Sequence, residues 1–225
     1  AAFAKQYLFA VSDTNTPPYI LSFLLIYKNG SFSRSIEFNS NILQIRSTES
    51  YVFVSLESTI HVLEIETFNL ISTIERPNKS GLITASEKYI AYINDDNLGY
   101  VTIASVPGFS IIQNIQCHKD PITTLSISED GNLLITSSTV GTLIRTFGIG
   151  NGSKLDEYRR GFTQSTIVAT SANDLLICAI SPTTLHIFLG DGQHITAKMN
   201  STPMACRVMG SSVAIIDING ILSMY

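Results

Sequence analysis

The chain has 225 residues, of which 44% are apolar and 14% are charged, and its formal net charge is -4. This composition excludes an intrinsically disordered chain, and the slightly acidic balance argues against bulk binding to nucleic acid. No apolar run is long enough to cross a bilayer, and no basic segment leads into an apolar core at the start. We therefore expect neither a membrane span nor a secretory signal.

Short runs of β-branched and aromatic residues follow one another along the chain, separated by Gly, Asn, Asp, Ser and Pro. Such runs are typical of strands, and no stretch of helical length shows a 3.6-residue apolar period. The sequence therefore predicts an all-β protein. In chain order, the clearest runs are YVFVS (51–55), TIHVLEIE (59–66), YIAYI (89–93), LLITSS (133–138), TLIRTF (142–147), LLICAI (175–180), TLHIF (184–188) and SVAIIDI (212–218).

These runs come in pairs, each made of a first apolar strand, a turn and a second strand. The first strands centre near residues 9, 53, 91, 135, 177 and 214, in steps of 37 to 44 residues. A period of about 40 residues with four short strands per unit is typical of a β-propeller, whose sheets cover one another's faces. The alternative, a β-sandwich, gives no reason for a near-constant step, so we favour the propeller.

We expect a single propeller domain over residues 1–225, with six blade-like units represented. The first unit shows no clear innermost strand, and the last ends after its third strand at Tyr225. The predicted units are about 1–38, 39–76, 77–117, 118–160, 161–199 and 200–225.

The three cysteines, Cys117, Cys178 and Cys206, stand far apart and form no CxxC pair. They predict neither a disulfide framework nor a zinc site, and they favour a reduced, cytoplasmic protein. Cys117 precedes His118, but no third group stands at the spacing of a nucleophilic triad. No phosphate-binding loop, dinucleotide glycine pattern or HExxH motif appears either. We therefore expect a protein that is not an enzyme and that uses no cofactor or metal.

Five of the fourteen basic residues lie in the stretch 118–161, and two of them, Arg159 and Arg160, are adjacent near the end of an outer strand. Adjacent residues of an extended strand point to opposite faces, so the two arginines cannot serve one pocket together. Their guanidinium groups favour two neighbouring anion sites. Side chains that could complete such sites are Thr136, Ser138, Thr142, Thr184, His118 and His186. The alternative is that both arginines pair with surface carboxylates such as Asp156 or Glu157.

Several segments resemble the PROPPIN family of WD-repeat-like propellers. The family's Phe-Arg-Arg-Gly motif stands here as Tyr158-Arg159-Arg160-Gly161, and His118-Lys119-Asp120-Pro121-Ile122 is similar to its His-Lys-x-Pro-Leu segment. The segments 128–134, 141–147 and 184–188 resemble the strands that follow in the family. The resemblance covers almost the whole chain and is strongest over 118–188. It implies seven blades, so we expect a first blade to be missing from this sequence.

The resemblance also implies two pockets for phosphatidylinositol 3-phosphate and phosphatidylinositol 3,5-bisphosphate. By position, the first pocket would use His118, Ser138, Thr142, Arg145 and Arg159. The second pocket would use Arg160, Thr184 and His186. An autophagy partner would bind an early blade, roughly within residues 1–76. These properties would make the protein a recruitment scaffold, peripherally associated with autophagosomal precursor, endosomal or vacuolar membranes.

The sequence departs from the family pattern around the second pocket. Ala179 and Ile180 stand where small hydroxyl residues are usual, and Phe162 follows the glycine where Thr is common. Only LGDGQ (189–193) occupies the place of a long, partly apolar loop, and we interpret the neighbouring His194 as a solvated residue. We therefore expect a weaker second pocket, in a monomeric protein that binds no nucleic acid. A protein-interaction scaffold without lipid binding is the alternative function.

Overall fold

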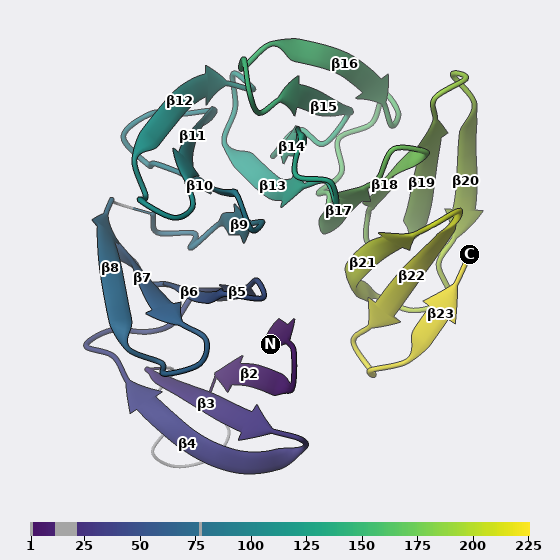
Figure 1. Ribbon diagram of the computed structural model, residues 1–225. Helices are drawn as coiled ribbons and strands as arrows, with labels where there is room; N and C mark the ends of the chain where they lie inside the picture. Colours follow the sequence, from purple (N-terminus) through teal and green to yellow (C-terminus); the bar gives the residue numbers. More distant parts are fainter. Residues whose placement is uncertain (1, 12–21, 77) are drawn as a thin grey trace. The chain divides into compact units, whose positions relative to one another are not determined.

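The computed structural model describes residues 2–11, 22–76 and 78–225, and within these ranges every regular element is a strand (Figure 1). No helix occurs in these ranges, and so none of membrane-spanning length. The all-β prediction is confirmed. The strands are β1 (Ala2–Ala4), β2 (Tyr7–Val11), β3 (Phe23–Lys28), β4 (Ser31–Glu37), β5 (Gln44–Ser47), β6 (Tyr51–Ser55), β7 (Thr59–Glu64), β8 (Leu70–Glu75), β9 (Ile83–Ala85), β10 (Tyr89–Ile93), β11 (Tyr100–Ser105), β12 (Ile111–Gln116), β13 (Ile122–Ile127), β14 (Leu133–Ser138), β15 (Leu143–Gly148), β16 (Lys154–Arg159), β17 (Ala169–Ala172), β18 (Leu176–Ile180), β19 (Thr184–Leu189), β20 (His194–Lys198), β21 (Pro203–Met209), β22 (Ser212–Asp217) and β23 (Leu222–Met224).

The strands form six sheets in which each strand pairs with the next one along the chain. Five sheets have four strands, and the last, β21–β23, has three. The first sheet begins with β1, so the innermost strand, which is not clear from the sequence, is present. The three residues AFA are too few for propensity alone to predict a strand. Strand β1 is defined by the pairing of these residues with Tyr7–Phe9.

Burial changes across each sheet in a way that explains the sequence pattern. The second strands, such as β14 and β18, are buried almost throughout, because both of their faces are covered. The fourth strands, such as β16 and β20, are mostly exposed. Continuous apolar runs therefore mark second strands, as they do in any sheet that is covered on both sides.

The chain divides into two compact units, one made of residues up to 96 together with 104–110, and the other of 97–103 and 111–225. In the first unit, one core cluster gathers around Phe9, Leu24 and Val54, and another around Phe53 and Tyr92. In the second unit, a cluster containing Ile144, Tyr158 and Phe188 joins the sheets β13–β16 and β17–β20. A further cluster of this unit, joining β17–β20 to β21–β23, includes Cys178 as a core residue, and the partly buried Cys206 packs against it.

Candidate anion sites on the two sides of strand β16

The register of β15 against β16 determines which face each arginine occupies. Leu143 lies opposite Arg159, and Arg145 lies opposite Glu157, so these four residues share one face. Tyr158 lies opposite Ile144 on the other face, which packs against β17–β20. A one-residue bulge between Thr146 and Phe147 leaves Leu155 unpaired and sets this register.

The first candidate site lies on the face of Arg145. Its Nε donates to Glu157 Oε2 at 2.8 Å, and its Nη1 donates to the carbonyl oxygen of Cys117 at 2.8 Å. Lys154 Nζ also lies 3.5 Å from Glu157 Oε2. The hydrogen bond from Arg145 is the main cause that lowers the pKa of Glu157, so this carboxylate is charged at neutral pH. One of the hydrogen-bond donors of Arg145 is therefore already bonded to a negatively charged carboxylate.

His118, the second residue after β12, is buried beside Arg145. Its Nε2 lies 3.0 Å from Thr136 Oγ1, and Thr136 is opposite Arg145 in the sheet. Burial first, and then the charge of Arg145, lowers the pKa of His118 to about 4, so the imidazole is neutral at pH 7. The amides of Cys117 and His118 both donate to the carbonyl of Gly99, at 2.9 and 3.1 Å, which holds this segment in place. Burial also raises the pKa of Cys117 to about 12, so its thiolate is not formed at neutral pH.

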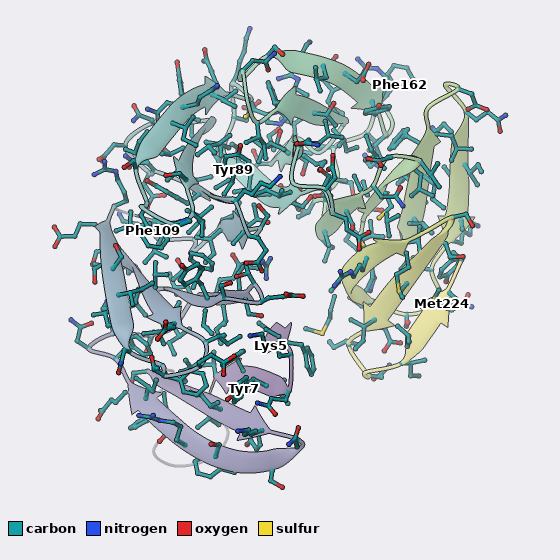
Figure 2. All side chains as sticks on the ribbon, in the orientation of Figure 1. Lys5, Tyr7, Tyr89, Phe109, Phe162 and Met224 are labelled. Carbon is teal, nitrogen blue, oxygen red and sulfur yellow. The ribbon has the colours of Figure 1, made fainter. Side chains whose placement is uncertain are left out.

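The other predicted residues of this site lie along the same sheet. Ser138 is buried at the end of β14, and Thr142 is partly buried just before β15. Arg159 is a diagonal neighbour of Arg145 across the ladder, a spacing of roughly 7–8 Å between backbones. The Arg159 side chain is exposed, and its guanidinium carbon lies 5.2 Å from the ring centroid of Phe162. Phe162, labelled in Figure 2, is 89% exposed just beyond β16.

The second candidate site lies on the side of β16 that faces β17–β20. Arg160 Nε donates to the carbonyl of Gly141 at 2.7 Å, and its Nη2 donates to the carbonyl of Thr163.

Among the described residues, the carboxylate of Glu157 pairs with Arg145 and Lys154, and not with Arg159 or Arg160. The sequence alternative in which Arg159 and Arg160 pair with Asp156 or Glu157 is therefore wrong for Glu157, and no described ion pair supports it for Asp156.

His186 and Thr184 lie on β19, on the same face as Phe188, because alternate residues of a strand share a face. Phe188 packs against Tyr158, with ring centroids 5.1 Å apart, so this face looks toward β13–β16. Burial, then the nearby His194 and the charge of Arg160, lowers the pKa of His186 to about 4. Thr184 is partly buried two residues before His186, on the same face of β19.

The sequence departures at this site have a clear structural effect. Ala179 lies directly opposite His186 and is fully buried in the apolar cluster shared with Phe188. A hydroxyl is therefore absent at this position of the sheet, while the imidazole of His186 is present.

The PROPPIN family model matches residues 3–213 of the chain. The chain belongs to the PROPPIN family. Among curated relatives, it is 32% identical over 160 residues to autophagy-related protein 18 of Dictyostelium discoideum, covering 68% of this chain and 43% of the relative. It is 30% identical over 175 residues to WD repeat domain phosphoinositide-interacting protein 1 of Xenopus laevis, covering 73% of this chain and 40% of the relative. The chain thus spans about two fifths of the length of these curated PROPPIN relatives.

Solved structures confirm the propeller prediction. Kluyveromyces lactis Hsv2 with its complete loop 6CD matches with a TM-score of 0.76 at 16% identity, covering 98% of this chain and 82% of that chain. A structure described as "Complex of KlAtg21 with coiled-coil of AgAtg16" matches with a TM-score of 0.85 at 20% identity, covering 100% of this chain and 78% of that chain. The six sheets are therefore blades of a PROPPIN β-propeller.

Two contacts of this PROPPIN were not identified from its sequence, namely those of Glu157 with Arg145 and of His194 with His186. His194 is exposed, as expected, but its Nε2 lies 3.1 Å from His186 Nδ1. The spacing of the two histidines could have predicted their contact. The short turn at 190–193 pairs Phe188 with His194, and this pairing makes His186 and His194 diagonal neighbours.

Proposed function

We propose that the protein binds phosphoinositide headgroups, phosphatidylinositol 3-phosphate and/or phosphatidylinositol 3,5-bisphosphate, through the two sites around Arg159 and Arg160. The observation that carries the proposal is the arrangement of two adjacent arginines on the two sides of one sheet. Each side also holds a buried, neutral histidine, His118 or His186. Guanidinium groups bind phosphate oxygens through two parallel hydrogen bonds, and a neutral imidazole can donate one more.

Binding at these sites makes and breaks no covalent bond. On the first side, a phosphate would compete with Glu157 for the hydrogen bonds of Arg145. Arg159 would leave its contact with the Phe162 ring and bind the same phosphate. On the second side, Arg160, Thr184 and His186 would surround the anion. Two headgroups held at once raise the effective affinity for a membrane well above that of either site alone. Stable peripheral attachment generally needs two such signals.

We further propose that the membrane-bound protein acts as a recruitment scaffold in autophagy or in endosomal and vacuolar traffic. The relatives named for autophagy support this role, and so does the similar structure described as a complex with a coiled coil of AgAtg16. An autophagy or membrane-traffic protein would then be the partner, bound on an early blade within residues 1–76. We keep the expectation of a monomer that binds no nucleic acid.

Flotation with phosphatidylcholine vesicles, with and without phosphatidylinositol 3-phosphate, tests the lipid proposal. The double variant Arg159→Thr, Arg160→Thr should lose more than tenfold in vesicle binding, because each charged hydrogen bond contributes about 1.5–3 kcal/mol. Arg207→Thr, which removes an exposed arginine of β21, is the matched control and should float like the wild type. Equal flotation of the wild type and the double variant on phosphatidylinositol 3-phosphate vesicles would overturn the proposal.

The same assay separates the second candidate function, a protein-interaction scaffold without lipid binding. The ion pair of Arg145 with Glu157 favours this alternative, because it satisfies a cation that lipid binding would use. A wild-type protein that is folded and floats on neither vesicle would support the scaffold function.

Glu157→Gln should strengthen binding of the headgroup of phosphatidylinositol 3-phosphate by about fivefold at low salt. The substitution removes the negative charge that competes for Arg145, and an ion pair of this exposure is worth up to about 1 kcal/mol. Isothermal titration with the soluble headgroup inositol 1,3-bisphosphate measures the change. Glu129→Gln, which changes the net charge equally but lies near Arg207, is the control. Weaker binding by Glu157→Gln would mean that Glu157 orients Arg145 rather than competing for it.

A further inference from the structure

The contact between His186 and His194 leaves one buried ring nitrogen without a protein partner. His186 is 5% exposed, and its Nε2 is buried with no hydrogen bond to any described residue. Its Nδ1 lies 3.1 Å from His194 Nε2. A buried polar atom left unpaired costs about 1–3 kcal/mol, so this nitrogen needs an explanation.

The position of His194 is well defined although it is exposed. Its ring stacks on Phe188, with centroids 4.4 Å apart and an angle of 19° between the planes. Phe188 is itself buried and packs against Tyr158. The stack holds the imidazole of His194 at a fixed place beside His186.

The hydrogen bond between the two rings can run in only two directions when both are neutral. A neutral imidazole has one N–H and one lone pair, on different nitrogens. If His194 Nε2–H donates to Nδ1 of His186, then His186 carries its hydrogen on Nε2. If His186 Nδ1–H donates instead, Nε2 has only a lone pair. A phosphate oxygen accepts hydrogen bonds and does not donate them when ionised, so only the first arrangement suits an anion.

The unpaired nitrogen lies on the side of the second candidate site. Nε2 is the ring nitrogen farther from the backbone, and the face of β19 that carries His186 looks toward β13–β16. Arg160 stands two residues after Tyr158, on the side of β16 that packs against β17–β20, and its charge contributes to the lowered pKa of His186.

We propose that His194 is a positioning residue for the second anion site: it donates to His186 Nδ1 and thereby presents His186 Nε2–H to a phosphate oxygen. The inference rests on the proposed lipid-headgroup function, because it assigns a role within that site. His194 does not touch the anion. It acts by fixing the tautomer of His186, as groups bonded to the second ring nitrogen do in other histidine sites.

Two variants separate the hydrogen bond from the stacking. His194→Phe keeps an aromatic ring on Phe188 but removes the donor, whereas His194→Gln keeps an N–H that can reach Nδ1. Both are made in the Arg159→Thr background, so that only the second site reports, and inositol 1,3-bisphosphate binding is measured by calorimetry. We expect about a tenfold loss for His194→Phe, equal to 1.4 kcal/mol, and recovery of most of the affinity in His194→Gln. In the Arg160→Thr background, neither variant should change binding.

Nitrogen-15 NMR of the His186 ring in the unliganded protein gives an independent readout. Hydrogen on Nε2 alone is expected in the otherwise unchanged protein and in His194→Gln, whereas a mixture of the two tautomers is expected in His194→Phe, because nothing then bonds to Nδ1. An unchanged tautomer in His194→Phe, or binding by that variant equal to that of its parent, would overturn the inference. If Arg160→Thr leaves inositol 1,3-bisphosphate binding unchanged, the proposed second site fails instead, and the ring nitrogen spectra still decide whether His194 sets the tautomer.

Discussion

Replacing Gly141 with alanine should destabilise the protein by about 3 kcal/mol and weaken anion binding through Arg160. Gly141 has a φ of +62°, which costs an L-residue roughly 1–2 kcal/mol. An added Cβ would also stand 1.7 Å from the carbonyl oxygen of Ser165, so the backbone must move. The carbonyl of Gly141 accepts the Nε hydrogen bond of Arg160, and this movement would displace the guanidinium. Urea unfolding and inositol 1,3-bisphosphate titration measure the two effects.

Gly210→Ala is the matched control, since Gly210 has a similar φ of +59° but nothing within 4 Å of an added Cβ. It should cost only about 1 kcal/mol, the conformational part alone, and should leave anion binding unchanged. Equal losses of stability in the two variants would show that the close approach to Ser165 contributes nothing.

The unfolding free energy should fall by about 4 kcal/mol between about pH 7.5 and about pH 5, about 2 kcal/mol for each of two histidines. The pKa values of His118 and His186 are lowered from 6.5 to about 4 in the folded protein, chiefly by burial. The unfolded chain therefore takes up protons at a higher pH than the folded protein does. Their contribution to stability is complete above pH 6.5 and is lost as the pH falls toward 4.

Urea titrations at a series of pH values measure how the unfolding free energy depends on pH. NMR titration of the two imidazole rings shows, without any substitution, whether these histidines cause that dependence. His61, whose pKa is lowered less by partial burial, is the internal reference. Stability that stays level from about pH 7 to about pH 5 would contradict the burial of neutral histidines at both sites.

The sequence alone predicted the strands with the most buried apolar residues and the alternation that separates Arg159 from Arg160. These features depend on local propensity and on the two-residue period of a strand, which a single sequence carries. It missed β1, whose three residues are defined only by pairing with β2. Short edge strands depend on partners elsewhere in the chain, so their own residues carry little signal.

The partner of Arg145 could not be predicted for a related reason. A regular hairpin starting from the pair Phe147 and Lys154 would place Asp156, not Glu157, opposite Arg145. The bulge at Leu155 shifts the ladder by one residue and brings Glu157 there. A one-residue shift of register exchanges the two faces of a strand, and the sequence between the two strands does not specify where the extra residue lies.

The bulge at Leu155 also separates strand β16 into two parts that can change independently. Residues 156–159 pair with β15 in a register set beyond the bulge, whereas the connection at 149–153 and Lys154 precede it. A residue gained or lost in that connection can be accommodated by a change at the bulge, so that residues 156–159 keep their register and the arginines keep their faces. The tip of this blade can therefore gain or lose a residue while each arginine keeps its side of the sheet.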